Sequence, residues 1–352
     1  MTPVGYWVRR NYQLTTSQSA ALDWLRGLAA QTVVLGHVLS ASGLSPPHFF
    51  VQDLGVASFF ILSGLLVTGS VMSKAGAYNF RQYFVARSAR IFVPYVPAVA
   101  LIVVVGWLLN LEGPIDAGTI AANLLLLEDF PLSRLTTWFP PIERVGTGRP
   151  LWSVAMEWWF YMAAAVLYFL GKQPLWSVPL VVAGIFVLIF NILVGTLGIV
   201  WLAGAVVAVA LPSLPRAWPW KVVAGFLLGA ALFRIIAVDW HFYDVHFALL
   251  LAAFMASSLV AIERDEWSER SATFAKLLAA YSYTLYLTHY TVMTAISDEL
   301  LQGATRVAAV VVISNLVAIS LWWLFERHHR SVASWLGKLL TVPRQDLPDR
   351  LS

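Results

Sequence analysis

Long apolar runs dominate this sequence and constrain its fold more than any other feature. Hydrophobic residues make up 59% of the 352 positions, charged residues make up 12%, and the mean hydropathy is +0.73. Soluble domains contain about 45–50% apolar and about 25% charged residues. Because one globule cannot bury this excess of apolar surface, most of the chain has to lie in a lipid bilayer. A soluble enzyme and a disordered chain are therefore excluded. The absence of Cys also excludes thiolate metal sites and disulfide scaffolds.

Ten stretches are apolar enough for helices that cross a bilayer, for which about 20 residues are needed. They lie near residues 20–40, 53–73, 91–110, 151–170, 176–194, 196–211, 221–238, 245–262, 277–297 and 304–325. The stretch 117–127 is too short to cross, since Glu128 and Asp129 end it, and we expect a short interfacial or re-entrant helix there. The expected fold class is all-α, a polytopic membrane bundle of about 10 transmembrane helices.

The distribution of basic residues predicts the orientation and the domain organisation. Most of the 23 Lys and Arg residues fall on one side of the bundle, which the positive-inside rule assigns to the cytoplasm. With an even number of spans, both termini are then cytoplasmic. We expect a cytoplasmic segment at 1–19, an integral-membrane domain at 20–326 with an outer loop at 111–150, and a short basic cytoplasmic tail at 327–352. The net charge of +4 indicates membrane orientation rather than nucleic acid binding, and no paired metal-ligand motif is present.

Arg26 and His37 lie within the first apolar stretch, and an ionisable residue costs about 2.5–3.5 kcal/mol at the centre of a membrane helix. Arg26 and His37 are separated by about 16.5 Å along a helix, which is close to three turns, so both lie on nearly the same face. Asp23 lies three residues before Arg26 and can pair with it. A snorkelling Arg and a hydrogen-bonded structural His would produce the same pattern, so both interpretations remain open.

Basic and small residues mark the next two stretches. Arg87 and Arg90 lie one helical turn apart directly before the third stretch. Two guanidinium groups on one face can hold a phosphate, although simple positive-inside anchoring explains them too. In the second stretch, the pair Ser63-Gly64 favours close packing of a neighbouring helix.

Further polar residues lie deep in the later stretches. Glu157 lies about two turns into the fourth stretch, at a depth close to that of His37. A carboxylate beside an imidazole orients the ring and stabilises its charged form, although Glu157 could equally pair with an Arg or a Trp ring nitrogen. His289 lies nearer the middle of the ninth stretch, between Tyr residues, where a structural role is the stronger interpretation.

Five segments together resemble the membrane acyltransferase-3 family, the bacterial acyltransferases that modify cell-envelope sugars. In chain order they read LDWLRGLAAQTVVLGH, FFILSGLL, RSARIFVPY, LWSVAMEWWFY and YSYTLYLTH. The resemblance covers about residues 20–330. The ten residues between Arg26 and His37, combined with the later Arg-x-x-Arg, are its most specific part.

The resemblance implies transfer of an acyl group, usually acetyl from cytoplasmic acetyl-CoA, to a sugar hydroxyl at the outer side of the bacterial inner membrane. Arg26, Arg87 and Arg90 would bind the coenzyme, which is a co-substrate, and no metal is implied. His37 would act as general base, or would be acylated itself and relay the group. Glu157 would orient His37.

Contacts to the acceptor, a cell-envelope carbohydrate or lipid-linked saccharide, are expected from several further residues. Ser63 and Tyr286 are candidates for stabilising the oxyanion, and His289 is a further substrate-binding candidate. We expect Trp138 and Trp152, with the acids of the outer loop, to form a platform for the sugar.

Three alternatives remain. A transporter or flippase of a lipid-linked saccharide would use the same polar residues without acyl transfer. A non-catalytic membrane subunit would use them to hold helices together. An acyltransferase with a succinyl donor would need a further cation near His37, and no Lys or Arg lies within two turns of His37 on its own helix.

Overall fold

The described part of the chain is helical. The computed structural model describes residues 13–45, 50–74, 79–111, 113–128, 142–169, 196–215, 219–237, 244–262 and 267–339, and these ranges contain no strand. The all-α class is therefore confirmed for them. The stretch predicted at 176–194 and the candidate Trp138 lie outside the described residues.

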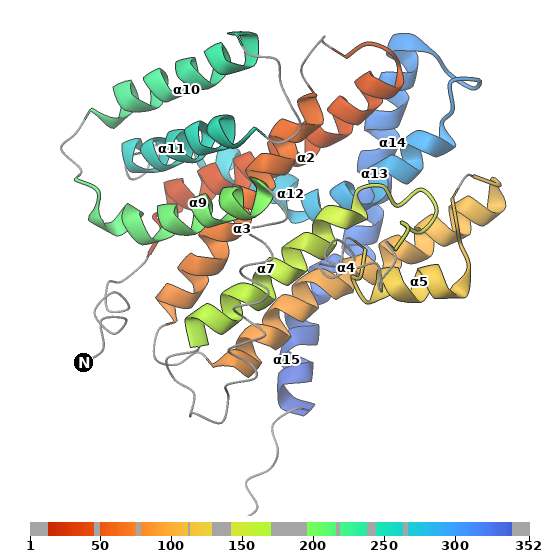
Figure 1. Cartoon of the computed structure of the whole chain (residues 1–352), viewed down its shortest axis with the longest axis horizontal. Coiled ribbons are helices and arrows are strands. Elements are labelled where there is room, and N and C mark those ends of the chain that lie inside the picture. The colour runs from red at the N-terminus through yellow and green to blue at the C-terminus, as the bar shows by residue number, and fades with distance from the viewer. Residues whose placement is uncertain are drawn as a thin grey trace, which may run out of the picture.

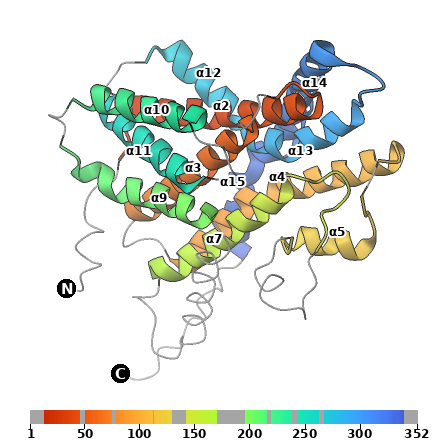
Figure 2. The ribbon, with the colours of Figure 1, turned by 45° about the horizontal axis from the view of Figure 1, so that its top comes forward.

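The helices form one bundle, with α2, α3 and α13 between α9–α11 on one side and α4, α5 and α7 on the other (Figures 1 and 2). Their bounds are α2 Thr16–Ala41, α3 Val51–Ser73, α4 Phe80–Leu108, α5 Ala117–Leu124, α7 Leu151–Phe169, α9 Thr196–Ala210, α10 Trp220–Ala237, α11 Val245–Ala261, α12 Glu269–Ala280, α13 Ser282–Ala295, α14 Gly303–Leu324 and α15 His329–Leu339. The short helix predicted within 117–127 is α5, and α15 lies within the predicted basic tail at 327–352.

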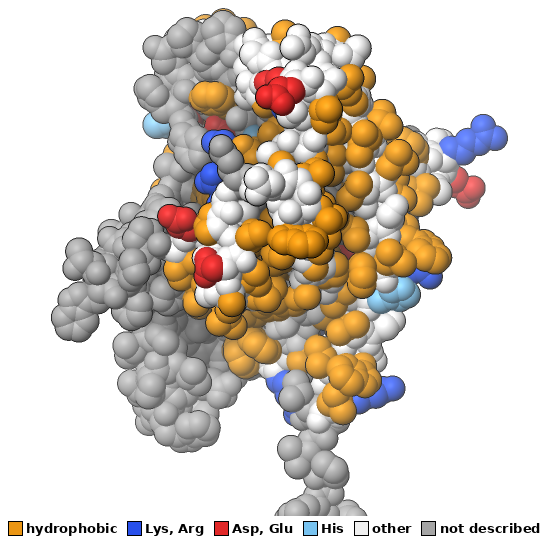
Figure 3. Space-filling model, turned by 90° about the vertical axis from the view of Figure 1, so that its right-hand side faces the viewer, with side chains coloured by type: hydrophobic (Ala, Val, Ile, Leu, Met, Phe, Trp, Pro, Cys, Tyr) orange, Lys and Arg blue, Asp and Glu red, His pale blue; other side chains and the backbone are white. Residues whose placement is uncertain are grey.

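The outer surface of the bundle is that of a membrane protein. Within the described ranges, four helical segments are long and apolar enough to cross a membrane, namely Val51–Ser73, Phe80–Leu108, Trp220–Ala237 and Gly303–Leu339. Shorter apolar helical segments are Leu197–Ser213 and Val245–Ala261. On the face shown in Figure 3, hydrophobic side chains cover much of the described surface and charged side chains lie mainly toward its edges. The total of ten spans and the orientation remain predictions.

Helix α4 begins well before the predicted apolar stretch at 91–110. The Asn79 side chain accepts a hydrogen bond from the Gln82 N–H at 2.9 Å, and the Gln82 side chain accepts one from the Asn79 N–H at 3.1 Å. This reciprocal capping satisfies backbone N–H groups that the first turn leaves free. Consequently Arg87 and Arg90, which precede the apolar stretch, lie inside a helix that continues through it.

The predicted span at 277–297 is two helices, α12 and α13, which meet at Tyr281. Glu326 explains how the break is stabilised. Its Oε2 accepts hydrogen bonds from the backbone N–H of Thr284 at 3.2 Å and from the Thr284 hydroxyl at 2.6 Å. Thr284 is in the first turn of α13, where N–H groups have no partner within the helix, so a carboxylate from a distant segment caps α13.

Two ends of the bundle differ in their ionisable residues. At the first, called the basic end, α2 and α4 begin and α14 ends. Its Lys and Arg residues include Lys74, Arg81, Arg87, Arg90, Arg327 and Arg330. At the other, called the histidine end, α2 and α13 end and α7 and α14 begin. It contains His37 and His289.

Close packing of α3 against α9 holds the centre of the bundle. A methyl group added to Gly64 of α3 would lie 2.0 Å from the Trp201 carbonyl oxygen, and one added to Gly204 of α9 would lie 2.0 Å from the Ile61 carbonyl oxygen. The two backbones therefore touch through reciprocal glycines. The close packing predicted at Ser63-Gly64 is confirmed.

Substituting Gly64→Ala should destabilise the protein, because the backbone that the methyl group meets cannot move as a flexible side chain would. We expect a fall in Tm of roughly 5 °C or more in detergent. Gly225→Ala is the matched control, since a methyl group at this helical glycine of α10 meets nothing within 4 Å. Equal Tm values for the two variants would contradict the packing.

Candidate active site

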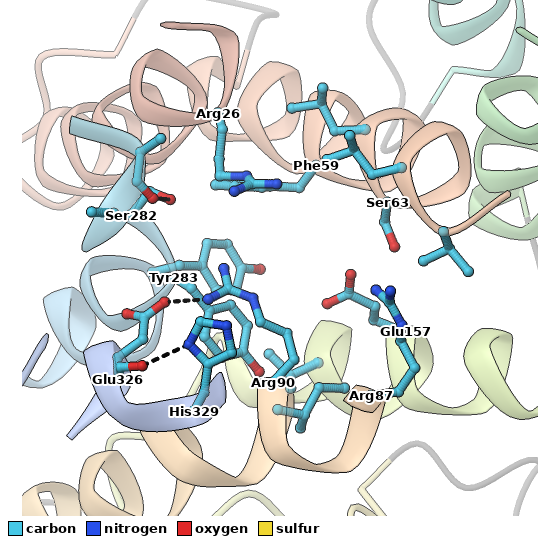
Figure 4. Close-up of a pocket in the computed structure, with 18 of the residues that line it drawn as sticks. Arg26, Phe59, Ser63, Arg87, Arg90, Glu157, Ser282, Tyr283, Glu326 and His329 are labelled. Carbon is cyan, nitrogen blue, oxygen red and sulfur yellow. Dashed lines mark hydrogen bonds and ion pairs between the residues drawn. The ribbon is translucent and has the colours of Figure 1, made fainter. Parts of the chain in front are cut away.

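A cavity of about 880 Å³ opens in the half of the bundle that includes the basic end. Residues from α2, α3, α4, α7, α12, α13, α14 and the segment after α14 line it, and Figure 4 shows α2 and α3 facing α4 and α7 across it. Its charged residues include Asp23, Arg26, Lys74, Arg87, Arg90, Glu157, Lys276, Glu326, Arg327 and Arg330. Cations outnumber carboxylates in this set, so the cavity is suited to an anionic ligand.

The three arginines predicted to bind a coenzyme all line this cavity. Arg26 extends into it from α2 (Figure 4). The guanidinium of Arg87 lies 5.7 Å from the ring centre of Tyr83 and 5.6 Å from that of Tyr161, and its Nε atom is buried without a hydrogen-bond partner. A buried donor without a partner is costly, so Arg87 is suited to bind a ligand.

Arg90 is paired with a buried counter-ion. Its Nη1 atom donates to Glu326 Oε1 at 2.7 Å, and Glu326 is 1% exposed. The next residue, Arg327, packs elsewhere, since its guanidinium lies 5.3 Å from the ring centre of Trp323. Glu326 thus joins Arg90 to the first turn of α13 and fixes Arg90 at the cavity wall.

Glu157 faces the cavity and Arg87 rather than His37 (Figure 4). Tyr161 donates its hydroxyl to Glu157 Oε1 at 2.6 Å. Ser63 donates to the Tyr161 hydroxyl at 3.4 Å, and the Trp201 ring N–H donates to Ser63 at 3.1 Å. The expectation that Glu157 orients His37 therefore needs correction. Equal depth along two helices does not bring two side chains together when they face different neighbours.

His289 occupies the place expected for Glu157. The His37 Nδ1 and His289 Nε2 atoms are 3.0 Å apart, and the two rings stack with their centres 5.1 Å apart. His289 is 1% exposed, whereas His37 is half-buried. His289 is therefore the hydrogen-bond partner of His37.

The hydrogen bonds of His289 determine which nitrogens carry protons. Its Nδ1 atom is 2.8 Å from the Tyr286 carbonyl oxygen and 3.2 Å from that of Leu285, and carbonyls only accept, so Nδ1 carries a hydrogen. Burying a charged imidazole without a carboxylate is costly, which favours neutral His289. Its Nε2 then accepts the Nδ1–H of His37. In neutral His37 this leaves Nε2 with a free lone pair, as a general base needs.

Tyr286 lies between the cavity and the two histidines. It lines the cavity, and its ring centre is 6.0 Å from that of His289. Of the other substrate-binding candidates, Ser63 lines the cavity, and Trp152 is half-buried against the hydrophobic core.

Sequence reasoning missed Arg149, Tyr161 and Tyr290. Arg149 donates to the Tyr290 hydroxyl at 3.2 Å, and the Tyr290 ring is edge-on to His37 with the centres 5.6 Å apart. Arg149 comes from the segment before α7. A search for a cation near His37 that considers only its own helix therefore does not find Arg149. Among the described residues, no group of three or more His, Asp or Glu side chains is placed to hold a metal ion.

A comparison with protein families decides the class of this protein. The acyltransferase 3 family model, described as an acyltransferase domain, matches residues 19–327. The chain belongs to the acyltransferase 3 family. Family membership and the apolar helices together make it a membrane acyltransferase. No curated protein and no solved structure matched the chain.

Replacing Glu326 with Ala should destabilise this acyltransferase strongly, because Arg90 would lose its counter-ion and α13 its cap. We expect a loss of about 3–5 kcal/mol of stability, seen as a lower Tm. Glu326→Gln can still accept hydrogen bonds and should lose less. Wild-type Tm in Glu326→Ala would show that the pair is not structural.

Proposed function

We propose that this membrane acyltransferase transfers a short acyl group, acetyl first of all, from acyl-CoA to a hydroxyl of a cell-envelope carbohydrate, with His37 as general base. The observation that carries the proposal is the hydrogen bond from His37 to His289, whose own Nδ1 is bound by backbone carbonyls. This arrangement supports a free lone pair on His37 Nε2. A bacterial inner-membrane location, with the cavity open to the cytoplasm, belongs to the same proposal.

The donor would bind in the cavity. Coenzyme A carries phosphates at one end and a long pantetheine arm at the other. Arg26, Arg87 and Arg90 supply planar N–H groups that suit phosphate oxygens. Since Arg90 already shares a hydrogen bond with Glu326, Arg26 and Arg87 would carry most of this binding.

The distance from Arg26 to His37 is one that the pantetheine arm of coenzyme A can span. Arg26 and His37 are separated by about 16.5 Å along α2, and Tyr283 and His289 of α13 lie beside the cavity and His37 respectively. The arm would therefore run along α2 and α13 from the basic end toward the histidine end.

The proposed reaction moves one proton and exchanges one bond. The acceptor hydroxyl oxygen attacks the thioester carbonyl carbon while its proton passes to His37 Nε2. The C–O bond of the ester forms, the C–S bond breaks, and the thiolate of coenzyme A takes the proton from His37. During these steps the His37 Nδ1–H remains bound to His289 Nε2, which stabilises the transient positive charge.

Glu157 would act at the donor rather than at His37. Its carboxylate accepts from Tyr161 at one oxygen, and it faces the cavity near Arg87 (Figure 4). A carboxylate there can accept a hydrogen bond from an amide N–H of the pantetheine arm. Glu157 would thus help to set the depth of the thioester.

A transporter shares one feature with this structure, the broken helix at Tyr281. In transporters, the freed ends of broken helices bind the substrate. Here Glu326 already accepts a hydrogen bond from the Thr284 N–H at the freed end. The break therefore favours a structural role and not a transport site.

Variants of His289 test the proposed base. His289→Ala removes the acceptor for the His37 Nδ1–H, and we expect kcat for acetyl transfer from acetyl-CoA in membranes to fall about 100-fold or more. His289→Gln offers an amide oxygen and should keep part of the activity. The pH profile of kcat/KM should shift in both variants.

The matched control is His246→Ala, since the His246 side chain is 79% exposed on α11; its kcat should stay within about twofold of wild type. Equal losses in His289→Ala and His289→Gln, with normal protein levels and an unshifted pH profile, would contradict the proposed role.

Removing the Arg87 guanidinium should weaken donor binding. We expect Arg87→Ala to raise KM for acetyl-CoA about 10–100-fold, which corresponds to the loss of about one or two charged hydrogen bonds. Arg81→Ala removes an exposed cation from the same helix and should change KM little. A KM effect of the same size in both variants would mean that only the general positive charge matters.

A further inference from the structure

Three residues separate the cavity from the histidine pair. The Tyr286 hydroxyl is hydrogen-bonded to the Ser153 hydroxyl at 2.5 Å, and the Phe59 ring packs edge-on against the Tyr286 ring with the centres 5.4 Å apart. All three residues line the cavity, whereas neither His37 nor His289 does. We call Phe59, Ser153 and Tyr286 the partition.

The far side of the partition is formed by the histidines. The ring centre of Tyr286 is 6.0 Å from that of His289, which in turn contacts His37. The rings of Tyr286 and His289 therefore lie between a thioester in the cavity and His37, the proposed base. The acyl group has to pass the partition, or displace part of it, before the base can act on its acceptor.

The members of the partition differ in how firmly they are held. Tyr286 is 7% exposed, is bonded to Ser153 through its hydroxyl, and binds His289 through its carbonyl oxygen. Moving the Tyr286 ring therefore breaks its hydrogen bond to Ser153, while the backbone of Tyr286 stays bound to His289. Phe59 has no polar atom in its side chain, is half-buried and points into the cavity (Figure 4). Of the two rings, Phe59 is thus the one that can move without breaking a hydrogen bond.

We propose that Phe59, set against the anchored ring of Tyr286, determines the length of acyl chain that this enzyme accepts. The inference rests on the proposed function and adds to it the residue that limits the acyl chain length. Two-carbon and three-carbon acyl groups pass after a rotation of Phe59, whereas a chain of eight carbons requires Tyr286 to leave Ser153. The donor class is short-chain acyl-CoA.

The test compares transfer from acetyl-CoA and octanoyl-CoA in membranes that contain the full chain. Wild type should use acetyl-CoA with strong preference. Phe59→Ala should raise the octanoyl to acetyl ratio of kcat/KM at least tenfold, and Phe59→Leu should give an intermediate ratio, which keeps the test valid if Phe59→Ala accumulates poorly.

Phe92→Ala is the matched control. Phe92 is also half-buried and packs edge-on against a Tyr ring, that of Tyr95, with the centres 6.4 Å apart, but it does not line the cavity. Its octanoyl to acetyl ratio should stay within about twofold of wild type.

Each outcome has one meaning. An unchanged ratio in active Phe59→Ala and Phe59→Leu, or a wild-type enzyme that uses octanoyl-CoA as well as acetyl-CoA, overturns the role of Phe59 and leaves the proposed function intact. A wild-type enzyme that transfers from neither donor overturns the proposed function, and the inference with it.

Discussion

The hydrogen bond between His37 and His289 is the contact on which the proposed chemistry depends. A lone imidazole at the edge of a membrane bundle can hold its proton on either nitrogen and can rotate. His289 removes both freedoms, because the backbone carbonyl of Tyr286 binds its Nδ1–H and its Nε2 atom faces His37. The backbone of α13 therefore determines, through two imidazole rings, which nitrogen of His37 is free to accept a proton.

Charged groups at the other side of the site are stabilised by a different means. Glu326 is almost fully buried, and it binds both Arg90 and the first turn of α13. The break between α12 and α13 thus supplies the N–H group that makes the buried carboxylate tolerable. Because the same helix carries Tyr283, Tyr286 and His289, α13 connects the arginine-rich cavity with the histidine pair. Placing the cavity and the base along one helix fixes their separation.

The sequence predicted the membrane class and the helical fold, and it singled out the three arginines that line the cavity, because each of these features leaves a local trace. Apolar length indicates a membrane helix, and the one-turn spacing of Arg87 and Arg90 places both on one face. Partners could not be predicted in the same way. Glu157 and His37 have similar depths, but depth does not give the direction in which a side chain points. The break at Tyr281 also left no signal in hydropathy, since the residue that stabilises it, Glu326, is distant in sequence.

The tautomer of His37 is the most direct test of the account. Nitrogen NMR of the ¹⁵N-histidine-labelled protein near neutral pH, with the His37 signals assigned by their loss in His37→Ala, distinguishes a protonated from an unprotonated ring nitrogen. We predict a neutral His37 with hydrogen on Nδ1 and none on Nε2. A neutral His37 with hydrogen on Nε2 would contradict it, because the nitrogen that faces the acceptor could then not take a proton.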